Sequence, residues 1–197
     1  MRPLPIELPK PMFEGTPQNL KVPNLEPLRK GPRPAFLAPE GTVNLAKGRR
    51  VVASGGDPTT GELAQITDGE KSGADGNHVE LAAGAQYITI DLKQKSTIYA
   101  VLVWHYHKQP RVYKSVIVQV ANDPDFIEGV HTVFNNDYEN SAGLGIGKEK
   151  NYIETSEGKL IDAKGLEGRY VRLYSNGSNV NGSNHYVEVE VFGRPLK

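Results

Sequence analysis

Cysteine is absent from this chain of 197 residues, which excludes disulfide bonds, thiolate metal sites and a cysteine nucleophile. An excess of charge of either sign is also lacking, because 23 Lys and Arg residues balance 23 Asp and Glu residues. Nucleic acids and anionic membranes attract basic surfaces, so we expect neither as a partner. No apolar run approaches about eighteen residues, and Met1–Pro5 lacks the apolar segment of a signal peptide. The sequence therefore predicts no membrane span.

The common catalytic motifs are missing as well. There is no Gly-x-Ser-x-Gly elbow, phosphate-binding loop, His-Glu-x-x-His motif or dinucleotide fingerprint. Carboxylates such as Glu154, Glu157 and Asp162 occur, but nothing in the sequence brings two of them within the roughly 5–10 Å that glycoside hydrolysis requires. We interpret them as solvated charges on strands and turns, and we expect no enzymatic activity.

Proline is concentrated at the start of the chain, where ten of the 14 prolines fall within residues 1–40. Such spacing prevents a helix or a central strand, because proline lacks a backbone donor. Apolar residues still recur there, among them Leu8, Phe13 and Phe36. We predict an extended Pro-rich arm or linker over residues 1–42. It either lies on the surface of the domain or forms a disordered tether, and it could hold a protein partner.

Beyond this segment, apolar and polar residues alternate over several stretches, as in Tyr87–Leu92 and Val187–Val191. A period of two is typical of half-buried strands. Ten short strands are expected, at Val51–Ala53, His78–Leu81, Tyr87–Leu92, Ile98–His107, Ser115–Ala121, His131–Asn135, Tyr152–Thr155, Leu160–Asp162, Tyr170–Ser175 and Tyr186–Gly193. We predict an all-β fold, an antiparallel β-sandwich of jelly-roll type, formed by one domain over residues 43–197.

Six segments resemble discoidin domains in their order and spacing: Asn44-Leu-Ala-Lys-Gly48, Ile66-Thr-Asp-Gly69, Ile88-Thr-Ile-Asp-Leu92, Val101-Leu-Val-Trp-His105, Tyr170-Val-Arg-Leu173 and Glu188-Val-Glu-Val-Phe-Gly193. These domains are also called coagulation factor 5/8 type C domains, and they are similar to family 32 carbohydrate-binding modules. The resemblance covers roughly residues 43–193. It implies a galactose-binding-like β-sandwich, a structural calcium ion near the Asp-Gly turn, and ligand recognition by loops at one end without catalysis.

Asp68-Gly69 is the turn that concerns calcium. Calcium takes six to eight oxygen ligands, which a tight turn of carboxylates and carbonyls can supply. The resemblance places the ion among Asp68, the turn from Glu70 to Ser72, and Glu188. Gly73 occupies the place where these domains often carry a hydroxyl, so Ser72 is slightly out of register. The alternative is an ordinary turn with a solvated carboxylate.

The segment Trp104-His-Tyr-His107 ends an apolar strand, so its last residues are expected at an exposed rim. His105 and His107 would then share one face. Such a pair could chelate a metal, but the residues that follow include Lys108 and Arg111 instead of a carboxylate. The alternative is sugar recognition by imidazole, guanidinium and aromatic groups. We expect Trp104 itself to be a core residue.

An Asn-rich loop, Ser175–His185, is expected beside this rim. The alternative is a hairpin-like turn whose amides tolerate left-handed backbone. The predicted sugar-binding residues are His105, His107, Arg111, Tyr113, Asn184 and His185.

Together these features predict a non-catalytic carbohydrate-binding module, an accessory domain of a secreted or cell-envelope protein, located outside the cell or in the periplasm. Its partner would be a glycan or small sugar. The alternative is a protein interaction or adhesion domain, because one fold can serve both functions.

Overall fold

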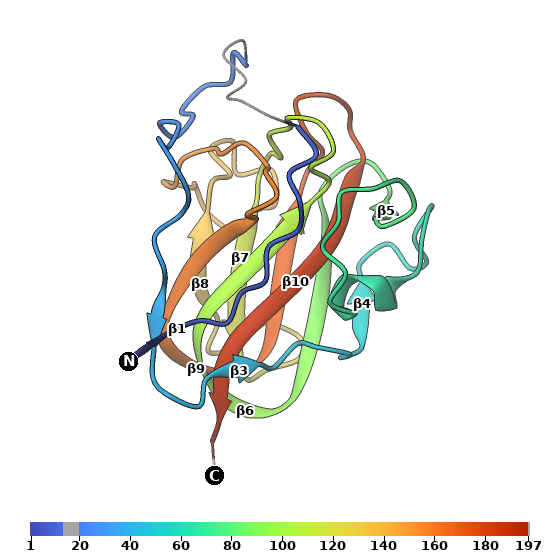
Figure 1. Ribbon diagram of the computed structural model, residues 1–197. Helices are drawn as coiled ribbons and strands as arrows, with labels where there is room; N and C mark the ends of the chain where they lie inside the picture. Colours follow the sequence, from blue (N-terminus) through green and yellow to red (C-terminus); the bar gives the residue numbers. More distant parts are fainter. Residues whose placement is uncertain (14–19, 197) are drawn as a thin grey trace.

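A computed structural model describes residues 1–13 and 20–196, so residues 14–19 of the arm and Lys197 lie outside the described part. Figure 1 shows the elements along the chain. They are β1 Arg2–Pro3, β2 Leu37–Ala38, β3 Val43–Asn44, β4 Val51–Ala53, the 3-10 helix η1 Leu63–Thr67, β5 Val79–Leu81, β6 Gln86–His105, β7 Ile117–Ala121, β8 His131–Asn135, β9 Lys159–Ser175 and β10 Asn184–Pro195. No helix among the described residues is long and apolar enough to cross a membrane.

The two longest strands, β6 and β9, build both layers of the sandwich. They pair antiparallel from Gln86 opposite Ser175 to Val103 opposite Lys159, and the register shifts between the two halves. The paired strands fold over near these shifts (Figure 1), where Lys93 has a positive φ of 76°. The first half of β6 therefore lies in one layer and its second half in the other.

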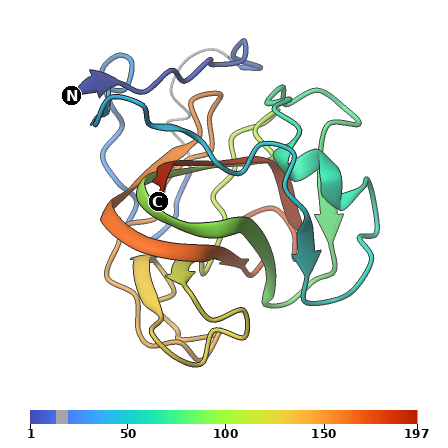
Figure 2. The ribbon, with the colours of Figure 1, turned by 90° about the horizontal axis from the view of Figure 1, so that it is seen from below.

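The remaining strands extend these two layers. In one layer, β4 pairs with the first half of β6, and the second half of β9 pairs with β7, which pairs with β8. In the other, β10 pairs with the second half of β6 and also with β3 and β5. Seen from below, these strands curve around a common interior (Figure 2). The predicted antiparallel β-sandwich is confirmed.

Alternation along the strands fills this interior with aliphatic side chains. Buried members of the core cluster include Ile88, Ile90, Val101, Val103, Val118, Val171, Leu173, Val189 and Val191. Each layer contributes every second residue, because successive side chains of a strand point to opposite faces. The strand period recognised in the sequence is therefore the period of the core.

The Pro-rich arm covers the outer face of the layer that contains β10. Its residues Leu4, Ile6 and Phe36 pack against a second apolar cluster, which consists of Ala100, Leu102, Trp104, Val187 and Phe192. The two-residue strands β1 and β2 pair with each other inside the arm. The described arm residues thus lie along the sandwich, which makes both faces of β6 apolar over Ala100–Trp104.

One expected strand is not formed. Tyr152–Thr155 has no strand pairing, although Tyr152 and Glu154 are buried. This segment packs against the loop after β6, where the backbone amide of Glu154 donates to the Arg111 carbonyl oxygen at 2.8 Å. Its apolar and polar residues alternate because of this packing and not because of strand pairing. Four other expected strands are halves of β6 and β9.

Candidate functional site

The loops after β6 and before β10 lie at the same end of the sandwich (Figure 1), which we call the loop end. Four hydrogen bonds join them, one of which is donated by the Asn176 backbone amide to the Lys114 carbonyl at 2.9 Å. The Val112 amide donates to Asn179 Oδ1 at 2.8 Å, the Asn179 amide to the Val112 carbonyl at 2.9 Å, and the Lys114 amide to the Gly177 carbonyl at 3.0 Å. The Asn-rich loop therefore lies beside the rim that carries Arg111, as its position in the sequence indicates.

His105 is buried at this end, and the expectation that it is exposed at the rim is wrong. Its side chain is 1% exposed, and its Nδ1 lies 2.7 Å from Oε1 of Glu154, which is also buried. The imidazole stacks on the Tyr113 ring with a centroid distance of 4.4 Å. Because β6 continues to residue 105, the side chain that follows Val103 on the same face points into the core. His105 therefore supports the loop end from inside.

His107 and Asn184 are also buried and hold loops together. His107 Nε2 lies 2.9 Å from the Lys71 carbonyl oxygen. The side-chain Nδ2 of Asn184 donates to the backbone carbonyls of Ala82 and Gly84 at 2.8 and 2.9 Å. Its Oδ1 accepts from the backbone amide of Gly177 at 2.8 Å. Direct contact of either side chain with a surface ligand would require these bonds to open.

Arg111 is the predicted site residue that lies best for ligand contact. Its guanidinium lies over the Tyr106 ring, 4.5 Å from the centroid, and both side chains are partly exposed. Nε and Nη1 of Arg111 are buried and have no hydrogen-bond partner among the described residues. A fixed cation with unused donors beside an aromatic face can hold a polar, ring-shaped ligand.

Tyr113 and His185 lie beneath this pair. The Tyr113 hydroxyl is 3.0 Å from His185 Nδ1. Burial is the main cause that lowers the pKa of His185 to about 4; Glu80 opposes this shift, and the charge of Arg111 contributes to it. His185 is therefore neutral near pH 7. Burial also raises the pKa of the Tyr113 phenol, so it stays protonated.

Two neighbours of His185 were not predicted as site residues. One ligand atom each of His78, Glu80 and His185 lies within 4.8 Å of the others, and His185 Nε2 is 3.7 Å from Glu80 Oε2. His78 also packs edge-on against Tyr106 at a centroid distance of 5.2 Å. The His-x-Glu spacing of His78 and Glu80 on an expected strand is visible in the sequence. That His185 lies beside them becomes known only from the pairing of β5 with β10.

The Asp-Gly turn follows η1 directly, and Gly69 supplies the positive φ of 97° that the turn needs. Asp68 Oδ1 accepts from the Glu70 amide at 2.7 Å, and Glu70 Oε1 accepts from the Ser72 amide at 2.8 Å. The side chain of Ser72 accepts from the Ala74 amide at 3.2 Å. The side chains of Glu70 and Ser72 are thus bonded to their own loop.

Glu188 reaches this turn from β10, as the resemblance implies. Its Oε2 accepts from the Gly69 amide at 3.1 Å, while its Oε1 is buried without a partner. Burial is the main cause that raises the pKa of Glu188 to about 9; the hydrogen bond from the Gly69 amide opposes this shift, and the nearby carboxylates of Glu190 and Asp68 contribute to it. Lys71 pairs with Glu190 at 2.8 Å, so it does not neutralise Glu188 directly. An orphaned buried carboxylate oxygen beside an oxygen-rich turn fits a cation such as calcium.

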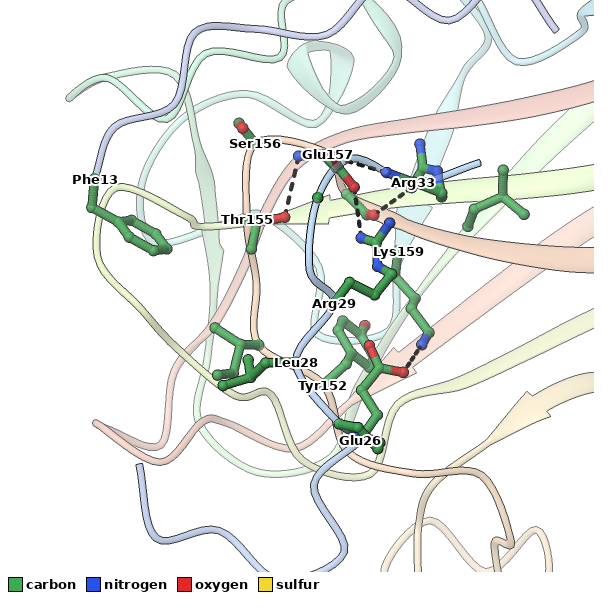
Figure 3. A pocket seen from close by; sticks show the side chains of 15 residues that line it. Phe13, Glu26, Leu28, Arg29, Arg33, Tyr152, Thr155, Ser156, Glu157 and Lys159 are labelled. Carbon is green, nitrogen blue, oxygen red and sulfur yellow. Dashed lines mark hydrogen bonds and ion pairs between the residues drawn. The ribbon is translucent and has the colours of Figure 1, made fainter. Parts of the chain in front are cut away.

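A pocket of about 650 Å³ lies elsewhere, between the arm and residues 152–160 (Figure 3). Ion pairs cross it: Arg29 Nη2 is 2.6 Å from Glu157 Oε2, and Lys159 Nζ is 2.6 Å from Glu26 Oε2. The Arg33 amide also donates to Glu157 at 3.1 Å. The Arg33 guanidinium donates to the Gly158 carbonyl at 2.8 Å, so these ion pairs and hydrogen bonds fasten the arm to the domain.

Comparison with known proteins gives no match to a family model or to a curated sequence. Solved structures do match. The CBM32 of AlyQ, in complex with 4,5-unsaturated mannuronic acid, has a TM-score of 0.53 and 21% identity, and the match covers 73% of this chain and 93% of that chain. CpGH89CBM32-4 of Clostridium perfringens, in complex with GlcNAc-α-1,4-galactose, has a TM-score of 0.53 and 17% identity, covering 79% of this chain and 96% of that chain. This chain has the fold of family 32 carbohydrate-binding modules.

The same discoidin-type fold occurs as part of a larger protein. The family 89 glycoside hydrolase of Clostridium perfringens in complex with PUGNAc has a TM-score of 0.59 and 16% identity, and the match covers 78% of this chain but 15% of the enzyme. Because a fold hosts many functions, the ligand has to be argued from the loop end itself.

Proposed function

We propose that the protein is a non-catalytic carbohydrate-binding module that holds its ligand at the loop end, around Arg111 and Tyr106. The observation that carries this proposal is the partly exposed guanidinium of Arg111, stacked on Tyr106, with two buried nitrogens that lack a hydrogen-bond partner among the described residues. The sugar complexes of the similar modules support the ligand class.

The chemistry of the pair suits a pyranose. The aromatic ring can cover the apolar face of the sugar, while the guanidinium donates to two neighbouring oxygens. A carboxylate on the sugar would strengthen this contact, because hydrogen bonds between ionised partners are stronger than neutral ones. Of the predicted set, the buried His105, His107, Tyr113, Asn184 and His185 then position the site, and Arg111 contacts the ligand.

A calorimetric screen with neutral monosaccharides, disaccharides and uronic acids tests this proposal. A shallow site exchanges water hydrogen bonds for sugar hydrogen bonds, so we expect a Kd in the high micromolar to millimolar range, about 4–6 kcal/mol. We expect uronic acids among the better ligands. The absence of any sugar binding, together with capture of a defined protein partner, would support the interaction-domain alternative.

We further propose that the module serves as an accessory domain of a secreted or cell-envelope protein, outside the cell or in the periplasm. Support comes from the family 89 glycoside hydrolase, in which a region of this fold accounts for 15% of the chain. A weak binding module is useful when it keeps a larger protein near an extended glycan, since linkage raises the effective concentration of the second site.

A structural calcium ion is the final part of the proposal. The residues that would hold it are Asp68, Glu188 and carbonyl groups of the turn over residues 70–72, with side-chain oxygens of Glu70 and Ser72 available after a rotation. A bound calcium ion would give a partner to Glu188 Oε1, which is buried and has no hydrogen-bond partner among the described residues. The ion would thereby tie the turn after η1 to β10, and we assign it no role in catalysis.

Removing calcium is expected to lower Tm. An ion that binds only the folded protein stabilises it by about 2.7 kcal/mol at 100 times its Kd. For a chain of this size we expect a shift of roughly 5–10 °C between calcium and chelator, measured by thermal unfolding. Glu188→Gln should remove this difference, because the amide carries no charge, and it should not destabilise the chelated protein, because it relieves a buried carboxylate.

Glu167→Gln is the matched control, since Glu167 lies on an exposed part of β9 with a side chain that is 50% accessible. This variant should respond to calcium as the parent protein does. A Tm that does not change with chelator, or a Glu188→Gln variant that still responds to calcium, would contradict the proposed calcium site.

A further inference from the structure

We propose that His78, Glu80 and His185 form a binding site for a divalent transition-metal ion of the zinc class. The site lies at the loop end, it is separate from the calcium site, and the argument for it does not depend on sugar binding. It rests on the backbone register, on the chemistry of the three donors and on the groups that orient them.

The register of two strands brings the donors together. His185 of β10 lies opposite Glu80 of β5 in the antiparallel pairing, so their side chains share one face of the layer. His78 is two residues before Glu80 and lies on that same face, because side chains alternate along extended backbone. The three ligand atoms accordingly lie within 4.8 Å of one another.

The distances are close to those of a metal site. Bonds of about 2.0–2.1 Å in a tetrahedral arrangement separate donor atoms by roughly 3.3 Å. His185 Nε2 and Glu80 Oε2 are already 3.7 Å apart. Small side-chain rotations of the partly exposed His78 and Glu80 would therefore complete the set, with no movement of the backbone.

The donor types favour zinc or a similar ion over calcium. Two imidazoles and one carboxylate match the ligands of zinc, nickel and copper, whereas calcium takes oxygen ligands. Three protein ligands leave a fourth position open. Because His78 and Glu80 are partly exposed, that position would be accessible to water or to a ligand from solution.

Neighbouring groups hold the donors in place. The Tyr113 hydroxyl, 3.0 Å from His185 Nδ1, can accept a hydrogen bond from Nδ1–H, which leaves the Nε2 lone pair directed toward Glu80. Nδ1 of His78 is buried and has no hydrogen-bond partner within residues 1–13 and 20–196. The backbone of Glu80 is fixed on its other side, where its amide donates to the Thr60 carbonyl at 2.9 Å and its carbonyl accepts from the Thr59 amide at 2.8 Å.

One nearby charge opposes the metal. Arg111 stacks on Tyr106, whose ring is in turn 5.9 Å from the His185 ring, so the guanidinium lies close enough to repel a cation. We therefore expect zinc affinity in the micromolar range. Removing this cation with Arg111→Ala should tighten zinc binding while weakening sugar binding, which separates the two proposals.

Titration of the full chain, without a histidine tag, with zinc chloride in the presence of excess calcium chloride tests the site. Calorimetry should show one zinc ion per chain. Glu80→Gln and His78→Gln should each weaken zinc binding by about ten-fold or more, because each removes one of three protein ligands. His131→Gln is the control, since His131 is an exposed histidine on β8 and should leave zinc affinity unchanged.

Several results would contradict the proposed zinc site. No saturable zinc binding by the parent chain would overturn the site, as would Glu80→Gln and His78→Gln variants that bind zinc as the parent chain does. An equal loss in His131→Gln would show that zinc binds surface histidines without a defined site. Weaker zinc binding in Arg111→Ala would contradict the assigned ligand set.

Discussion

Deletion of residues 1–42 is expected to lower the free energy of unfolding by about 3–6 kcal/mol and to promote association of the remaining domain. The arm residues Leu4, Ile6 and Phe36 cover the outer apolar cluster that includes Leu102 and Phe192. Each large apolar side chain returned to water costs roughly 1.5–3 kcal/mol, and the deletion exposes several of them in part. Urea unfolding and size-exclusion chromatography of the truncated and full-length chains measure both effects.

Point variants in the full-length chain distinguish packing from other consequences of deletion. Phe36→Ala should reproduce part of the loss, because Phe36 is partly buried against the cluster. Leu28→Ala should change stability little, because Leu28 is 46% exposed. A truncated chain as stable and as monomeric as the full-length chain would show that the arm is only a tether and that residues 43–197 suffice for the domain.

His105→Ala is expected to cost about 3–5 kcal/mol and to lower Tm by roughly 10 °C. The substitution leaves the carboxylate of Glu154 buried without the imidazole that lies 2.7 Å from it. It also opens a cavity beside Tyr113, on which the imidazole stacks. Thermal and urea unfolding measure the loss.

The control for this prediction is His131→Ala, which changes an exposed histidine and should alter stability by about 0.5 kcal/mol at most. If His105→Ala unfolds like the parent chain but no longer binds a ligand, the imidazole acts in recognition and its supporting role is refuted.

The fold could be predicted from the sequence because the alternation of apolar and polar residues along each strand shows which side chains are buried. Residues such as Ile88 and Val189 mark a period of two that only a half-buried strand requires. The joining of two expected strands into β6 was not predictable, because local pattern does not show that Lys93 bends a continuous strand. The segment at Tyr152 alternates without pairing, since burial alone produces the same pattern.

The candidate site was less predictable, because it depends on pairings between distant segments. The sequence pointed to Arg111 and His185 through their residue types, and both lie at the loop end. It could not show that His105 faces inward, because the last residue of a strand and the first residue of a loop look alike. Glu80 became a candidate only once β5 was seen to pair with β10.

Calorimetric titration of the parent chain and of Arg111→Ala with the best ligand from the sugar screen tests the central claim most directly. A guanidinium that donates two hydrogen bonds has no replacement at the loop end, so we expect Arg111→Ala to lose most of the binding. Arg29→Ala, in the pocket between the arm and the domain, should bind the sugar as the parent chain does. Equal sugar affinity of the parent chain and Arg111→Ala would contradict the account and place the ligand elsewhere.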